Sequence, residues 1–127
     1  MREAFDLQIH TLKQGSEKKI MDFVNKMTRR HDKDKYLIEK LEALLKSKHS
    51  GIKEEPRRFL RMVFLSFILA DIGDQLSPFV RNENIGIIKS ICEKQDINYN
   101  QLVDLTEYNN ELMEIVSSII DTKKSAS

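Results

Sequence analysis

Residues 59–72 form an almost continuous apolar run, interrupted only by Arg61, Ser66 and Asp71. Because one residue turns a helix by about 100°, these three polar residues scatter around it and leave no polar face. A helix that is hydrophobic on all sides is normally buried among other helices. The run is also too short to cross a bilayer, which needs about 20 apolar residues. We therefore expect a central helix over about 57–72, enclosed by amphipathic helices.

The composition favours helices throughout. The chain of 127 residues has only four Gly and two Pro, whereas an all-β fold needs many turns. Apolar residues recur at helical spacing before and after the central run. The sequence therefore predicts an all-α fold, a single-domain bundle of about five helices over residues 1–121. The small and charged residues 122–127 predict a frayed C-terminal tail.

Two positions leave the helix count open. Gly15 is followed by Ser16 and Glu17, and this order is typical of a break and a new N-cap. Thr106 and Glu107 interrupt the last apolar stripe in a similar way. Each stretch is either one kinked helix or two shorter helices.

The two halves of the chain carry opposite charge. Residues 1–64 contain sixteen Lys and Arg against ten Asp and Glu, a net charge of +6. Residues 65–127 contain five against ten, a net charge of −5. The asymmetry indicates either a basic surface for an acidic partner or two halves that attract each other within one fold. We expect the second arrangement.

Basic residues gather where two pairs of predicted helices meet, and clusters of this kind neutralise phosphates in nucleic-acid-binding proteins. The candidate polyanion-binding residues are Lys26, Arg29, Arg30, Lys33, Lys35, Arg57, Arg58 and Arg61. The short connection at 96–98 is similar in length to that of a helix-turn-helix. However, the helix after it carries Asp104, Glu107 and Glu111, which would repel DNA. Nucleic acid is therefore expected at the N-terminal half, if it binds.

The last predicted helix carries an apolar stripe near the C-terminus, where few later segments remain to cover it. Its candidate interface residues are Leu112, Met113, Val116, Ile119 and Ile120. An uncovered stripe of this size marks an interaction site, and a second copy related by a two-fold axis would cover it as a homodimer. Alternatively, the stripe folds back on the central helix.

The segment from His10 to Lys13 resembles the phosphoacceptor segment of histidine phosphotransfer domains, whose pattern is His-x-Leu-Lys-Gly on a four-helix bundle. The resemblance implies that His10 accepts a phosphoryl group and that Lys13 offsets its charge. The sequence departs from the pattern at Gln14, where the family has glycine, and only nine residues precede His10. We prefer an ordinary surface histidine at this position.

Other catalytic and ligand-binding signals are absent from the sequence. The three histidines and the single Cys92 are too widely separated to suggest a zinc site, and no Gly-rich phosphate loop is present. Cys92 is expected to be a small core residue, and a single cysteine is compatible with a cytoplasmic location. We predict no cofactor and no membrane span. The expected function is a non-catalytic helical interaction module, an adaptor or regulatory protein with a protein partner. The alternative is a nucleic-acid-binding protein that uses the basic N-terminal half.

Overall fold

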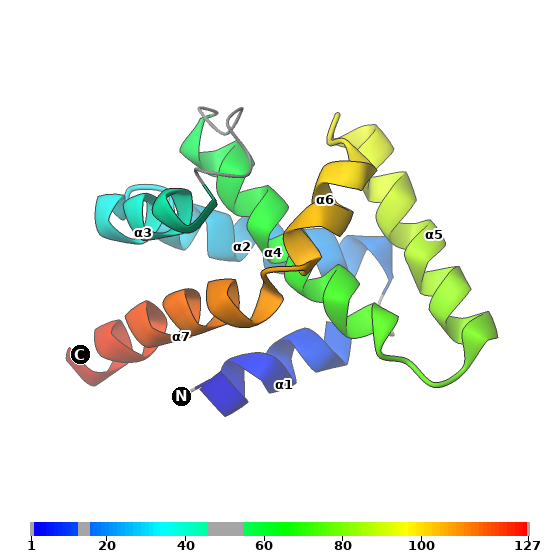
Figure 1. Ribbon diagram of the computed structural model, residues 1–127, viewed down its shortest axis with the longest axis horizontal. Coiled ribbons are helices and arrows are strands. Elements are labelled where there is room, and N and C mark those ends of the chain that lie inside the picture. Colours follow the sequence, from blue (N-terminus) through cyan, green and yellow to red (C-terminus); the bar gives the residue numbers. More distant parts are fainter. Residues whose placement is uncertain (1, 13–15, 46–54, 127) are drawn as a thin grey trace.

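The computed structural model describes residues 2–12, 16–45 and 55–126, and over these residues it is all-helical (Figure 1). The prediction of an all-α bundle is confirmed for this part of the chain, but seven helices are present where about five were expected. In chain order they are α1 (Arg2–Leu12), α2 (Glu17–His31), α3 (Lys35–Leu45), α4 (Pro56–Gly73), α5 (Pro78–Lys94), α6 (Tyr99–Thr106) and α7 (Asn109–Ala126).

Both of the open break points separate two helices. Ser16 is the N-cap of α2, and its Oγ accepts a hydrogen bond from the Lys19 backbone N at 3.3 Å. A capped start of this kind satisfies one of the orphan donors of the first turn. Thr106 ends α6, and its Oγ1 donates to the carbonyl of Val103 at 2.5 Å. The structure therefore has a separate helix on each side of both break points.

The expected central helix is α4. It packs against α1, α2, α5, α6 and α7, while α3 packs on α7. In Figure 1, α2 runs behind α4 and α6 crosses in front of it. Eleven residues of α4 are buried, namely Phe59, Leu60, Met62, Val63, Phe64, Leu65, Ser66, Phe67, Ile68, Leu69 and Ile72. The apolar run thus forms the centre of the core, as predicted.

Four phenylalanines join α4 to the N-terminal helices. Phe5 of α1 and Phe23 of α2 meet Phe64 and Phe67, with ring centroids 6.0–6.5 Å apart. Most of these pairs are edge-to-face, the geometry that the quadrupoles of aromatic rings favour. The cluster therefore fixes how α1 and α2 sit on the central helix.

The apolar stripe of α7 faces inward. Leu112, Met113 and Val116 are buried, and Ile119 is partly buried against the same core. They are covered by their own chain, because α7 packs against α1, α3 and α4. For these residues the structure shows the second of the two expected arrangements, in which the stripe packs back into its own bundle. The side chain of Ile120 lies outside the residues that the structure describes.

The turn between α5 and α6 contains a residue with a positive φ angle. Asp96 has φ 55°, in the left-handed region that favours glycine. The Ile97 backbone N donates to the carbonyl of Cys92 at 2.8 Å, and the Asp96 backbone N donates to Glu93 at 3.4 Å. These two bonds form the Schellman motif that ends many helices. The buried Ile97 follows directly and anchors the turn in the core.

The C-terminal helix continues further than expected. Its backbone is helical to Ala126, whereas the expected tail began at residue 122. The side chains beyond Ile119 lie outside the described residues, so fraying of this tail remains a prediction. In the described chain, no helix combines the length and the apolar character needed to span a membrane.

Candidate functional site

The two predicted basic clusters meet at one point, where α2 ends and α4 begins. Arg57 Nε lies 2.6 Å from Asp32 Oδ2, and Asp32 is the C-cap residue of α2. This hydrogen bond and the charge of Asp32 raise the pKa of the Arg57 guanidinium above its ordinary value. Arg57 is therefore already engaged by a carboxylate of its own chain.

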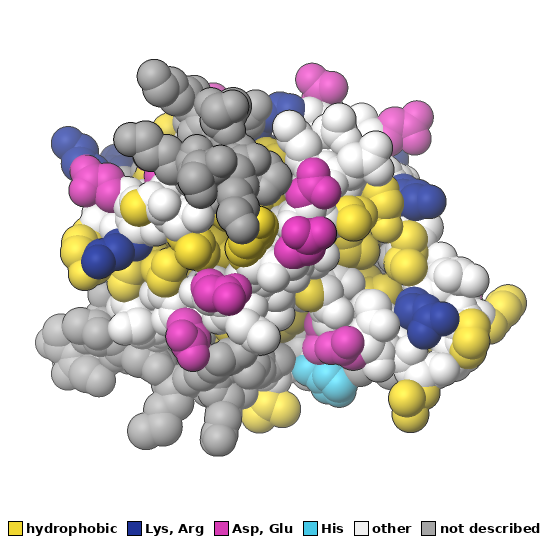
Figure 2. Space-filling view, in the orientation of Figure 1, with side chains coloured by type: hydrophobic (Ala, Val, Ile, Leu, Met, Phe, Trp, Pro, Cys, Tyr) yellow, Lys and Arg dark blue, Asp and Glu magenta, His cyan; other side chains and the backbone are white. Residues whose placement is uncertain are grey.

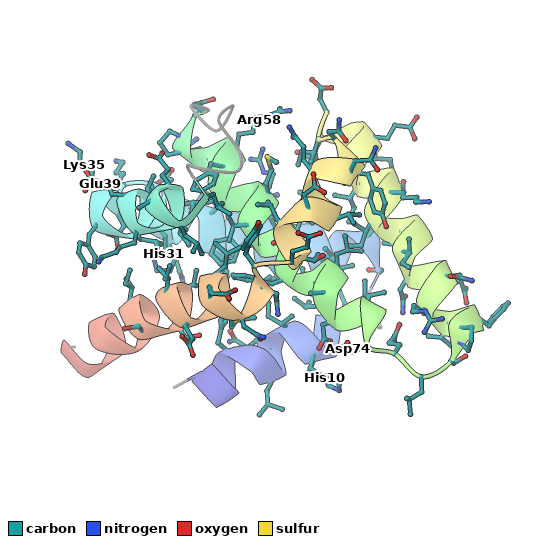
Figure 3. All side chains as sticks on the ribbon, in the orientation of Figure 1. His10, His31, Lys35, Glu39, Arg58 and Asp74 are labelled. Carbon is teal, nitrogen blue, oxygen red and sulfur yellow. The ribbon has the colours of Figure 1, made fainter. Side chains whose placement is uncertain are left out.

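The other two arginines of α4 are not part of a shared basic surface. Arg58 donates from its guanidinium to the backbone carbonyl of Asp96, which ties α4 to the turn before α6 (Figure 3). Arg61 is only partly exposed, and its Nε is buried without a hydrogen-bond partner in the described structure. The structure thus brings Arg57 to the end of α2, whereas Arg58 contacts the turn before α6 and Arg61 is partly buried.

The basic residues of α2, of the following turn and of the start of α3 have exposed side chains. Lys26, Arg29, Arg30, Lys33 and Lys35 are all exposed. Two more exposed lysines, Lys18 and Lys19, lie on the first turn of the same helix. The sequence analysis missed these two, although the helical spacing from Lys19 to Lys26 and Arg30 was a usable signal.

Acidic side chains gather on the opposite side of α4. Figure 2 shows them spread over the face that α6 and α7 form in front of α4. The exposed acids of these helices are Asp104, Glu107, Glu111 and Glu114. The exposed basic side chains of α2 belong to a helix behind α4, and these acidic side chains belong to helices in front of it (Figure 1). The opposite charges are therefore carried by different helices.

The connection between α4 and α5 carries an exposed apolar pair. Leu76 is 98% exposed and Phe79, in the first turn of α5, is 75% exposed. Ser77 and Pro78 lie between them, and Pro78 starts the helix. We call residues 76–79 the apolar tip. The sequence analysis assigned Ser77 and Pro78 correctly as a helix start but gave Leu76 and Phe79 no role.

Hydrogen bonds hold the apolar tip in one conformation. Gln75, directly before it, is buried, and its Oε1 accepts from Asn84 Nδ2 at 2.9 Å. The Gln75 carbonyl accepts from Arg81 at 3.1 Å. Ser77 Oγ caps α5 by accepting from the Val80 backbone N at 3.4 Å. The tip is thus anchored on both sides while its two large side chains face solvent.

A cleft of about 490 Å³ opens beside the apolar tip, between α4, α5, α6 and the start of α7. Its lining residues are Leu69, Ala70, Gly73, Asp74, Ile85, Tyr99, Val103, Thr106, Glu107, Asn109 and Asn110. Burial raises the pKa of the Tyr99 phenol, which keeps it a neutral hydrogen-bonding group. The lining mixes apolar side chains with amides, two carboxylates (Asp74 and Glu107), the Thr106 hydroxyl and the Tyr99 phenol.

His10 lies on an exposed edge of α1, near the end of α4 (Figure 3). Its Nδ1 is 3.5 Å from Asp71 Oδ2. Lys13 and Gln14, which carry the resemblance to a phosphoacceptor segment, lie outside the described residues. In the ranges that the structure does describe, no three His, Cys, Asp or Glu side chains are grouped so as to hold a metal ion.

Comparison of the chain with protein-family models, with curated proteins and with solved structures gave no match.

Proposed function

We propose that this protein is a non-catalytic interaction module, an adaptor or regulatory protein, that binds a protein partner through the apolar tip. The observation that carries the proposal is the exposure of Leu76 and Phe79 on a turn that is otherwise fixed by hydrogen bonds.

An apolar side chain in water loses the free energy that burial would supply, roughly 1.5–3 kcal/mol for Leu or Phe. Scattered exposed residues of this kind are common and need no explanation. Leu76 and Phe79 differ because both are large and strongly exposed on one short turn, next to a residue pair that is buried and polar. A partner pocket would bury both without any loss of loop entropy, since the turn is already ordered.

The charges around the apolar tip define the partner further. Asp74 and Glu83 are exposed on either side of it, and Arg81 is partly buried and bonded to Gln75. This acidic border would be repelled by an anionic lipid surface. It fits a protein pocket that is apolar at its centre and basic at its rim.

Photo-crosslinking in the cell of origin tests the proposal. A benzoylphenylalanine replaces Phe79 in one variant and Leu7 in a matched control, since both are large, apolar and exposed. We expect a discrete protein adduct at position 79, lost when Leu76→Ser is added, and a different pattern at position 7. The proposal fails if position 79 gives no adduct, or if both positions give the same ones.

A further inference from the structure

We infer that the exposed face of α2, continued by Tyr36 of α3, binds the phosphate backbone of single-stranded nucleic acid. This surface is distinct from the apolar tip and rests on different residues. Five basic residues define it on α2, and we call them the basic ridge: Lys18, Lys19, Lys26, Arg29 and Arg30.

The five residues of the basic ridge lie along one side of α2. At 100° per residue, its five members fall within an arc of about 120° on the helix, opposite the buried Ile20, Val24 and Met27. Lys18 and Arg30 are twelve residues apart, which corresponds to about 18 Å along the axis at a rise of 1.5 Å per residue. A row of cations of this length can reach more than one phosphate of an extended strand.

Among the described residues, the ridge forms no ion pair with its own chain. Over the described ranges, no carboxylate oxygen lies within the 4.0 Å ion-pair distance of any ridge nitrogen. Two nearby carboxylates are paired with other residues: Glu17 pairs with Lys94 at 2.9 Å, and Asp32 pairs with Arg57. Asp22 is the one acidic residue that shares the exposed face of α2. The ridge is therefore a cationic surface available to an external polyanion.

The apolar side of α2 distinguishes nucleic acid from a membrane. A helix that lies on a bilayer inserts its apolar face among the lipids. In α2 that face is used internally, because Ile20 and Val24 are buried and Phe23 packs on Phe64. The side chains of α2 that are exposed are all charged, so none of them would insert among lipid tails.

Tyr36 favours a single strand over a duplex. It is 62% exposed and lies just beyond Lys33 and Lys35, where α3 begins. The ammonium of Lys40 lies 5.5 Å from the centroid of the Tyr36 ring and holds it from one side. An exposed ring next to a row of cations is the arrangement on which unpaired bases stack. Stacked bases of a duplex offer no such contact.

The test measures binding of a fluorescent single-stranded oligonucleotide of mixed sequence, by anisotropy at several salt concentrations. The variant is Arg29→Gln with Arg30→Gln, and the matched control is Arg81→Gln with Lys89→Gln, which removes the same charge from α5 and keeps the ion pair of Lys94 with Glu17. The α2 variant loses two phosphate contacts, so its binding constant should fall less steeply with salt. The slope of log K against log salt should become less negative by about 1.4, at about 0.7 per contact with a single strand. Circular dichroism checks that both variants are folded.

Two further arms separate the sources of binding. Tyr36→Ala should weaken single-strand binding at least about fivefold and leave the salt slope unchanged, because stacking involves no counterion release. Leu76→Ser with Phe79→Ser should bind the oligonucleotide as the wild type does, which shows that the ridge is independent of the apolar tip.

The inference is overturned by any of three results. The first is a wild type that does not bind the single strand at low salt. The second is equal weakening by the α2 and α5 variants, which would mean that net charge alone acts. The third is tighter binding to duplex DNA, or to vesicles rich in phosphatidylserine, than to the single strand.

Discussion

The side-chain amide of Asn84 donates a hydrogen bond to Oε1 of Gln75 at 2.9 Å, and both residues are buried. Because Gln75 directly precedes the apolar tip, this bond decides whether Leu76 and Phe79 are presented on a fixed or a loose turn.

Asn84→Ala should leave the Gln75 amide buried without this partner, at a cost of about 1–3 kcal/mol. Urea unfolding measures the loss, and hydrogen exchange should show faster opening of the amides around residues 75–77. The control is Asn82→Ala at an exposed position of α5, expected to change stability by less than about 0.5 kcal/mol. Equal effects of the two substitutions would contradict an anchoring role for Asn84.

Phe64→Ala and Phe67→Ala should strongly lower the melting temperature. Both side chains are buried in the aromatic cluster, and Phe→Ala in a core costs about 3–5 kcal/mol, out of a total stability of about 5–15 kcal/mol. Thermal unfolding followed by circular dichroism measures the change. Phe79→Ala is the matched control, because Phe79 is exposed and should melt like the wild type. Unchanged melting of both core variants would disprove the central position of α4.

The centre of the fold was predictable because its signal is local. The apolar residues from Phe59 to Ile72 have no polar face, and such a helix has only one stable environment. Cys92 was similarly predicted to be a core residue, and it is 2% exposed. The helix count was less predictable, since the residues around Ser16 and Thr106 fit either one kinked helix or two shorter helices.

The surfaces were less predictable because contacts distant in sequence determine them. Arg57, a candidate polyanion-binding residue, is bonded to Asp32, 25 residues earlier, a contact that the local sequence does not indicate. Arg58 reaches the carbonyl of Asp96, 38 residues later. The pattern Leu-Ser-Pro-Phe indicates a helix start, yet nothing in it shows whether Leu76 and Phe79 are covered. That depends on which helix packs beside α5.

Replacing Val116 and Ile119 with Glu tests how α7 is covered. Val116 is fully buried, so a carboxylate there would be unpaired in the core, and we expect the variant to lose its cooperative melting. Light scattering of the wild type supplies the second readout. A dimeric wild type whose double variant is a folded monomer would instead support a homodimer through this stripe.

Stability should fall as the pH rises from 9 to 11. Burial raises the pKa of the Cys92 thiol from its ordinary 9.0 to about 11. In this range the unfolded chain releases the thiol proton while the folded chain keeps it, so the folded state binds more protons and loses stability with increasing pH. Urea midpoints measured at intervals of half a pH unit test this. Cys92→Ala should show a shallower decline, and parallel curves would contradict the prediction.

Asp96→Gly should stabilise the protein by about 0.5–1 kcal/mol. The left-handed φ of Asp96 is unfavourable for a residue with a Cβ atom, and glycine adopts it freely. The bond from Arg58 goes to the backbone carbonyl and is kept by the substitution. Asp96→Ala is the control and should be destabilising, because it keeps the Cβ atom and loses the local polar group. The urea midpoint should therefore increase in one variant and decrease in the other.

The central position of α4 also has a consequence for how the chain is made. A ribosome releases α4 before α6 and α7, so the side of α4 that faces α6 has no cover when it first emerges. From Gly73 to Thr106 the ribosome adds 33 residues, which takes roughly 2 to 7 seconds at 5–20 residues per second. During that interval this strongly apolar helix is exposed to solvent or to a chaperone. Premature termination anywhere before α6 would therefore yield a fragment prone to aggregate.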